Sequence, residues 1–155
     1  MSIRIYTDGS AKGNPGPGGY GIVLLSDEGH RKELAKGYRK TTNNRMELLS
    51  VIVALEMLKS RPTDVLVYSD SKYVVDAVEK KWVFNWEKKY FDKKKNVDLW
   101  KRFLIIYRQH NVTFFWVKGH ANNVENERCD KLAVAAAEAE QHHDIDKGYE
   151  AQAQN

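Results

Sequence analysis

The 155-residue chain contains a single cysteine, Cys129, so it cannot form an internal disulfide bond. Its apolar runs fall well short of the roughly 20 residues that a membrane-spanning helix needs. The first residues lack the charged and apolar regions of a signal peptide. These absences predict a cytoplasmic protein that requires neither an oxidising compartment nor a membrane.

Basic residues are unevenly distributed along the chain. The net charge is only +4, from 25 Lys and Arg against 21 Asp and Glu. Residues 80–102 alone hold nine basic and three acidic side chains, which is a local charge of +6. Such a patch favours a polyanionic partner, most commonly a nucleic-acid backbone, although a solvated helix face is the structural alternative.

The pattern of apolar residues predicts one domain with an α/β fold. Residues 3–7, 19–26 and 31–40 read as strands joined by short turns, which indicates an antiparallel meander. The remaining elements are, in order, a helix at 43–59, a buried strand at 64–69, helices at 71–78 and 97–109, a strand at 112–117 and a helix at 125–140. This order predicts a mixed five-stranded sheet flanked by helices. Residues 142–155 are polar, and we expect them to form a frayed tail.

Four carboxylates stand at the ends of these elements. Asp8 closes the first strand and Asp70 follows the fourth, while Glu47 and Asp130 lie in the first turns of two helices. If the first and fourth strands are neighbours, all four acids converge at one edge of the sheet. Carboxylates that close together repel one another unless cations neutralise them. All-oxygen ligation suits Mg²⁺ or Mn²⁺ rather than zinc, and two such ions support phosphodiester cleavage.

Each acid also has an ordinary structural interpretation. Asp8 fits an Asx turn, and Asp70 fits the N-cap of a helix. Glu47 follows Asn44 by three residues, as in a capping box, and Asp130 fits a solvated helix position. Their convergence, rather than any single residue, favours a functional site.

A glycine-rich segment follows Asp8. Residues 9–21 contain six of the ten glycines and two of the three prolines. A Walker phosphate loop is excluded because the segment lacks the required Gly-Lys-Ser/Thr sequence. The segment fits a compact hairpin turn, or a surface where missing side chains let a nucleic-acid backbone come close.

Five separated motifs give the chain its resemblance to bacterial type-1 ribonuclease H, from Ile3 to about Ala137. They are TDGSAKGNPGPGGYG, TTNNRMEL, SDSKYV, NVDLW and WVKGHANNVENERCDKLA. The resemblance implies strand order 3-2-1-4-5 in a catalytic domain at residues 1–141, a basic handle at about 80–96 and a flexible tail at 142–155. It also implies an enzyme that cuts the RNA strand of an RNA/DNA hybrid, leaving 5′-phosphate and 3′-hydroxyl ends. Nothing in the sequence demands more than a monomer.

The same resemblance implies roles for the acidic residues. Asp8 would bridge two Mg²⁺ ions, for which Mn²⁺ is a substitute. Asp130 would complete the ion that holds the attacking water, whereas Glu47 and Asp70 would complete the ion at the leaving 3′ oxygen. His120 would assist proton movement or product release, and its structural alternative is an exposed bystander.

Substrate contacts near the active site are also implied by the resemblance. Gly13, Asn14 and Asn44 match positions that contact RNA sugars and base edges, where the hybrid presents its 2′-hydroxyls in a wide, shallow minor groove. Thr42 and Asn43 match a pocket for a phosphate of the DNA strand. Helix capping is the structural alternative for both.

The basic handle supplies the remaining predicted contacts. Trp82, Trp86, Lys88 and Lys89 would grip the DNA strand, with Trp82 the more direct contact, although paired tryptophans more often anchor a core. Lys72 stands where many relatives carry Gln. Because lysine donates hydrogen bonds but accepts none, the contact at this position differs from theirs.

Two other functions fit a chain with these features. A DNA strand transferase or junction nuclease uses the same fold, and a hybrid-binding module would carry inert carboxylates. The TTNNRMEL motif and the basic handle disfavour the first function. The presence of all four acids disfavours the second.

Overall fold

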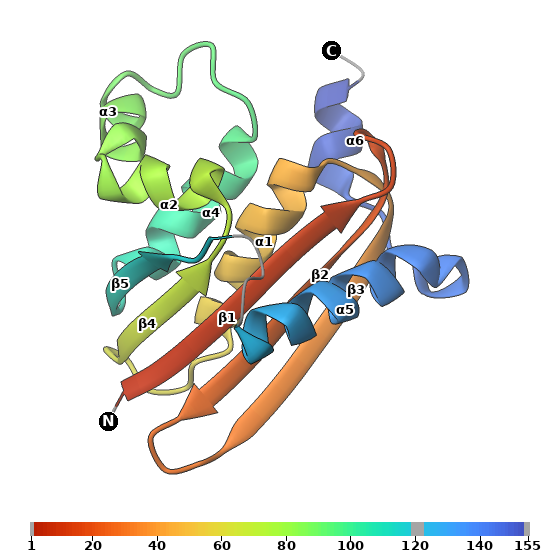
Figure 1. The fold of residues 1–155 in the computed structure, drawn as a ribbon. Helices are drawn as coiled ribbons and strands as arrows, with labels where there is room; N and C mark the ends of the chain where they lie inside the picture. The colour runs from red at the N-terminus through yellow and green to blue at the C-terminus, as the bar shows by residue number, and fades with distance from the viewer. Residues whose placement is uncertain (1, 119–122, 154–155) are drawn as a thin grey trace.

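The computed structural model describes residues 2–118 and 123–153, and its five strands form one sheet (Figure 1). The strands are β1 Ser2–Ala11, β2 Gly16–Ser26, β3 Arg31–Thr41, β4 Asp64–Ser69 and β5 Asn111–Trp116. Their order is β3-β2-β1-β4-β5. The first three strands pair antiparallel, and β4 runs parallel to both β1 and β5. The predicted order and mixed pairing are confirmed.

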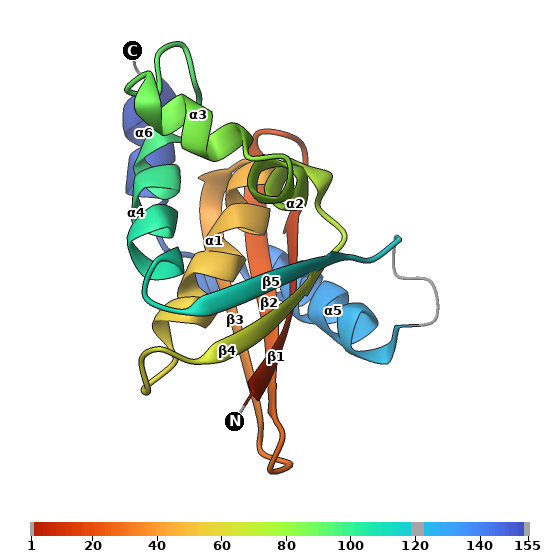
Figure 2. The same ribbon diagram turned by 90° about the vertical axis from the view of Figure 1, so that its left-hand side faces the viewer.

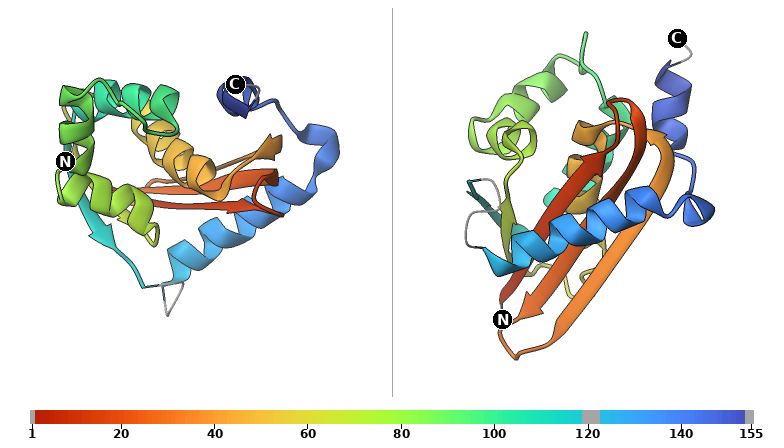
Figure 3. Two further views of the ribbon diagram at one scale, coloured as in Figure 1. Left: turned by 90° about the horizontal axis from the view of Figure 1, so that it is seen from above. Right: turned by 45° about the vertical axis from the view of Figure 1, so that its right-hand side comes forward.

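Helices cover both faces of the sheet. They are α1 Asn43–Glu56, α2 Lys72–Glu79, α3 Trp82–Lys88, α4 Val97–Tyr107, α5 Val124–Glu138 and α6 Lys147–Ala153, with a 3-10 turn at Glu140–His142. Helices α1 and α4 pack together on one side, whereas α5 crosses β1, β2 and β3 on the other (Figures 2 and 3). No helix among the described residues has the length and apolar character needed to cross a membrane.

Helix α1 lies between the sheet and α4, at the centre of the main core. Ten of its 14 residues are buried, so this helix carries charged side chains into the interior as well as apolar ones. The core around it includes Ile5, Ile22 and Val67 from the sheet and Trp100 and Phe103 from α4. Buried charges on α1 therefore need partners from neighbouring elements.

Two glycines allow helices to approach the sheet closely. A Cβ atom on Gly9 would overlap the backbone nitrogen of Glu47, so the absence of a side chain brings β1 against α1. A Cβ atom on Gly21 would overlap the carbonyl oxygen of Cys129, which lies on α5. Close helix packing is therefore a structural use of the glycine-rich segment, and it places Asp8 beside α1.

The C-terminal segment differs from the predicted frayed tail. Asp144 forms an isolated bridge with Tyr38 of β3, and Asp146 and Tyr149 are both buried. The segment ends in α6, which stands near the turn between β1 and β2 (Figure 1). The prediction is corrected for residues 142–153, which continue the folded body.

A buried arginine on α1 explains why this polar segment is ordered. The side chain of Arg45 is 1% exposed, and its guanidinium donates to both carboxylate oxygens of Asp146 at 2.8 and 2.9 Å. It also donates to both oxygens of Asp98 at 2.7 and 2.9 Å and to Asn96 at 3.2 Å. A buried cation of this kind is tolerated only with such partners, so it holds α4 and the C-terminal segment to α1.

Candidate active site

Three of the four predicted carboxylates meet at one edge of the sheet. One oxygen from each of Asp8, Glu47 and Asp70 lies within 4.8 Å of the others. Asp8 and Glu47 are buried, and Asp70 is half-buried. Because β1 and β4 pair in parallel, their carboxyl ends reach the same edge, and α1 begins beside it. The predicted convergence is confirmed for these three acids.

The fourth acid, Asp130, lies on α5 and lines the same cavity of about 470 Å³. It is half-buried, and it stands outside the close group of three. Asn43, Asn44 and Lys72 also line this cavity. The structure therefore places Asp130 on the wall of the carboxylate cavity, whereas the sequence predicted that it would converge with the other three acids.

The capping interpretations of two acids are wrong. Helix α1 is capped by Thr42, whose hydroxyl accepts from a backbone N–H of the first turn at 3.3 Å. Helix α2 is capped by Ser71, whose hydroxyl accepts in the same way at 3.3 Å. Asp70 is therefore not the cap of α2, and Glu47 is not at the position three residues after the α1 cap that a capping box needs, which strengthens the functional interpretation of both.

The electrostatics of Glu47 favour a bound cation. Burial raises the pKa of Glu47 well above its usual value, and the negative charges of Asp8 and Asp70 raise it further. Its Oε1 atom is buried and has no hydrogen-bond partner within the described parts of the chain. A buried acceptor without a partner is costly, by about 1–3 kcal/mol. A hard divalent cation would satisfy this oxygen and offset the repulsion, so the donor set fits such an ion.

Predicted substrate contacts gather beside the carboxylates. The side-chain oxygen of Asn14 accepts from the backbone N–H of Asn43 at 3.0 Å, which ties the glycine-rich turn to the start of α1. Gly13 adopts a φ of 74° in this turn, a conformation that favours glycine. Asn14, Thr42 and Asn44 line a second cavity of about 510 Å³. Its other walls include Lys94 and Lys95 of the handle and Tyr149 and Gln152 of α6.

The two handle tryptophans have different environments. Trp82 is 43% exposed at the start of α3. Trp86 is half-buried and packs against buried Trp100, with ring centroids 5.7 Å apart. Lys88 and Lys89 are exposed at the end of the helix. Trp82 therefore offers a ring to a ligand, while Trp86 anchors the handle to the core.

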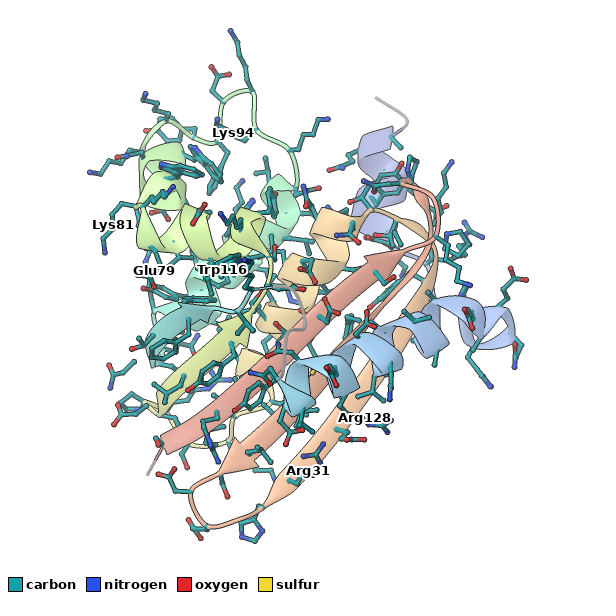
Figure 4. The ribbon with its side chains drawn as sticks, viewed as in Figure 1. Arg31, Glu79, Lys81, Lys94, Trp116 and Arg128 are labelled. Carbon is teal, nitrogen blue, oxygen red and sulfur yellow. The ribbon has the colours of Figure 1, made fainter. Side chains whose placement is uncertain are left out.

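The handle has an unusual backbone, which the sequence argument did not anticipate. All the described non-glycine residues with positive φ fall within it, and they are Lys81, Tyr90, Phe91, Lys93 and Asn96. A bidentate ion pair between Glu87 and Arg108, at 2.6 and 2.9 Å, joins α3 to α4. The handle therefore has a defined shape and projects from the body with Lys81 and Lys94 on its outside (Figure 4).

Sequence reasoning missed one residue beside the carboxylates. The indole N–H of Trp116 donates to the backbone carbonyl of Asp70 at 3.1 Å. The ammonium of Lys72 lies 4.7 Å from the centroid of the Trp116 ring. A tryptophan at the end of a strand gives no sequence signal that separates it from a core residue. The predicted residue His120 lies outside the described residues.

Comparisons with known proteins agree with this geometry. Residues 1–138 match the family model of RNase H. The Ribonuclease H of Desulforamulus reducens is 57% identical over 140 residues, and the match covers 87% of each chain. The Ribonuclease HI of Synechocystis is 54% identical over 140 residues, again with 87% of each chain covered.

Solved structures give a similar result. LC9-RNase H1, described as a type 1 RNase H with the type 2 active-site motif, matches with a TM-score of 0.79 at 32% identity, over 99% of this chain and 81% of that one. LC11-RNase H1, solved in complex with an RNA/DNA hybrid, matches with a TM-score of 0.63 at 27% identity, over 90% of this chain and 99% of that one.

Proposed function

The chain belongs to the ribonuclease H family and is a ribonuclease H that acts on RNA/DNA hybrids, and we propose that it hydrolyses the RNA strand with two divalent cations. The products are 5′-phosphate and 3′-hydroxyl ends. The observation that carries the proposal is the close group of Asp8, Glu47 and Asp70, in which a buried oxygen of Glu47 has no hydrogen-bond partner among the described residues. The alternatives of strand transfer and of a non-catalytic binding module are set aside by the family assignment.

In this proposal, each of the four acids is a ligand of one or both metal ions. Bound Mg²⁺, or Mn²⁺ as its substitute, supplies an activated water and stabilises negative charge on the leaving 3′ oxygen. Asp8 would be the shared ligand, because it lies on the central strand β1 just beyond the last residue paired with β4, in close reach of Glu47 and Asp70. Glu47 and Asp70 would hold the ion that stabilises the leaving oxygen, and Asp130, which also lines the cavity, would hold the ion that supplies the attacking water.

Residues around the cavity position the hybrid. Thr42 and Asn43 hold a phosphate of the DNA strand at the start of α1, while Gly13, Asn14 and Asn44 contact RNA sugars and base edges. This proposal is supported by the shared cavity walls and by the hydrogen bond between Asn14 and Asn43. It is also supported by the related LC11-RNase H1, which was solved with an RNA/DNA hybrid.

Handle residues and His120 complete the proposed machinery. Trp82, Lys88 and Lys89 grip the backbone of the DNA strand, which adds affinity with little sequence preference. His120 assists proton movement or product release. One copy of the chain carries all of these residues, so the proposed mechanism requires no second copy, and we propose a monomer.

Cleavage of end-labelled substrates tests the proposal. RNA/DNA hybrid, duplex DNA and duplex RNA are each incubated with the protein in Mg²⁺ or in EDTA. We expect cleavage of the hybrid alone, only with metal, and RNA products whose 3′ ends a polymerase extends directly. Asp70→Asn should abolish cleavage while hybrid binding persists.

Asp76→Asn is the matched control, since Asp76 lies on α2 and pairs with Lys80 at 3.6 Å, away from the cavity lining. This variant should cleave at the wild-type rate. Near-normal cleavage by Asp70→Asn, or equal cleavage of duplex DNA, would overturn the proposal.

A further inference from the structure

Trp116 stands where the pairing of β4 with β5 ends. Ser69 is the last β4 residue in the register and lies opposite Trp116, and its carbonyl accepts from the N–H of Val117 at 2.9 Å. Beyond Ser69 the chain leaves the sheet and turns into α2. The carbonyl of the next residue, Asp70, therefore lies beyond the ladder, and it accepts from the indole N–H of Trp116 at 3.1 Å.

The ring face of the same tryptophan holds a cation. The Lys72 ammonium lies 4.7 Å from the ring centroid, which is within the range of a cation–π interaction. Lys72 and Asp70 both line the carboxylate cavity, and Trp116 contacts each of them. A single side chain on the edge strand thus contacts two residues of the cavity through two separate groups, its N–H and its ring.

We propose that Trp116 is a positioning residue that fixes the backbone of Asp70 for metal binding and holds Lys72 for contact with a phosphate oxygen of the hybrid. The inference rests on the proposed function. The indole N–H donates to the backbone carbonyl of Asp70, so it fixes the Asp70 backbone and with it the direction of the Asp70 carboxylate. The ring acts on Lys72, whose compact charge suits a phosphate oxygen.

The neighbouring Phe115 provides an internal comparison. Its exposure, 43%, is nearly that of Trp116, 44%, and both lie on β5. Successive side chains of a strand point to opposite faces, and Phe115 stacks on Tyr68 with ring centroids 5.1 Å apart. If Trp116 contributed only aromatic packing on β5, replacing either residue should have a similar effect on binding. If Trp116 positions Asp70 and Lys72, only its replacement should weaken Mn²⁺ and hybrid binding.

Two substitutions separate the two groups of the indole. Trp116→Phe keeps a ring face and removes the N–H donor, so we expect Mn²⁺ binding to weaken about three- to tenfold, the range of one hydrogen bond. Hybrid affinity in EDTA should stay within about twofold. Trp116→Leu removes both groups, so it should weaken Mn²⁺ binding and also weaken hybrid binding about two- to fivefold.

Lys72→Met should weaken hybrid binding without weakening Mn²⁺ binding, because it removes a positive charge from the wall of the cation site. Because it removes one phosphate contact, it should lower the slope of log affinity against log salt by about one. In the double variant Trp116→Leu with Lys72→Met, hybrid binding should be no weaker than in Lys72→Met alone. Phe115→Leu is the control, and it should leave both affinities unchanged.

The measurements are Mn²⁺ titration by calorimetry without substrate, and hybrid binding in EDTA across a salt series. Each variant is studied well below its own thermal midpoint. Wild-type Mn²⁺ affinity in Trp116→Phe would overturn the role at Asp70. If the loss of hybrid-binding free energy in the double variant equals the sum of the losses in Trp116→Leu and Lys72→Met, the role at Lys72 is overturned. Failure of the wild-type protein to cleave hybrids would instead refute the proposed function, so the two failures are distinguishable.

Discussion

Replacing the buried arginine of α1 tests whether it orders the C-terminal segment. Arg45→Met keeps a long, flexible side chain and removes the guanidinium that donates to Asp98 and Asp146. Asp98 is 45% exposed at its side chain and can be solvated, but Asp146 is 7% exposed. The substitution therefore leaves one buried carboxylate without its cation.

The expected loss of stability follows from that buried charge. Removing one partner of a buried ion pair costs about 3–5 kcal/mol. For a chain of this size, a loss of 1 kcal/mol lowers the thermal midpoint by about 2–4 °C, so the midpoint should fall by about 6–20 °C. The double variant Arg45→Met with Asp146→Asn removes the unpaired charge and should recover part of this loss.

Thermal and urea unfolding measure these differences, and Arg102→Met is the matched control. Arg102 also forms a bidentate pair, with Glu56, but its side chain is 46% exposed. Exposed pairs contribute about 0.2–1 kcal/mol. The reasoning is refuted if Arg45→Met costs no more than Arg102→Met, or if the double variant is less stable than Arg45→Met alone.

Three further predictions concern the active site and the handle. Glu47→Gln should abolish cleavage yet stabilise the metal-free protein at pH 7. Because the pKa of Glu47 is raised in the folded state, its contribution to folding stability is complete below about pH 4.5 and is lost as the pH rises through the folded-state pKa. Unfolding in EDTA at several pH values checks this, and a lower unfolding midpoint for the variant at pH 7 would contradict it. Lys88→Ala with Lys89→Ala should weaken hybrid binding and lower its salt slope by about two, and an unchanged slope in a salt series would count against the handle's role. Trp82→Ala should weaken hybrid binding with little change in stability, whereas Trp86→Ala should lower the unfolding midpoint; a reversed pattern would contradict the assignment of these rings.

Much of the sheet and the carboxylate cluster could be predicted from the sequence. Apolar runs such as residues 64–69 mark buried strands, and the order of elements limits the number of topologies. Asp70, directly after a strand, is visible in the sequence, and so is Asp8, although β1 continues past it to Ala11; parallel pairing of β1 with β4 is enough to bring the two acids together.

Features that depend on distant partners could not be predicted. The segment around Asp146 reads as a polar tail because its partner, Arg45, lies 101 residues away and looks like a surface residue of a helix. The cap at Ser71 lies one residue after the expected Asp70, and the cap at Thr42 was one of several that the sequence allowed, since neighbouring side chains were also able to cap. Trp116 was missed for the same reason, because only the fold brings it to Asp70.

The most direct test of the central claim is calorimetric titration of Mn²⁺ into the wild-type protein and into Asp8→Asn, with hybrid cleavage measured on the same samples. The account predicts that the wild-type protein binds Mn²⁺ and cleaves the RNA strand, and that Asp8→Asn loses both properties while remaining folded. Wild-type Mn²⁺ affinity and normal cleavage in Asp8→Asn would contradict it.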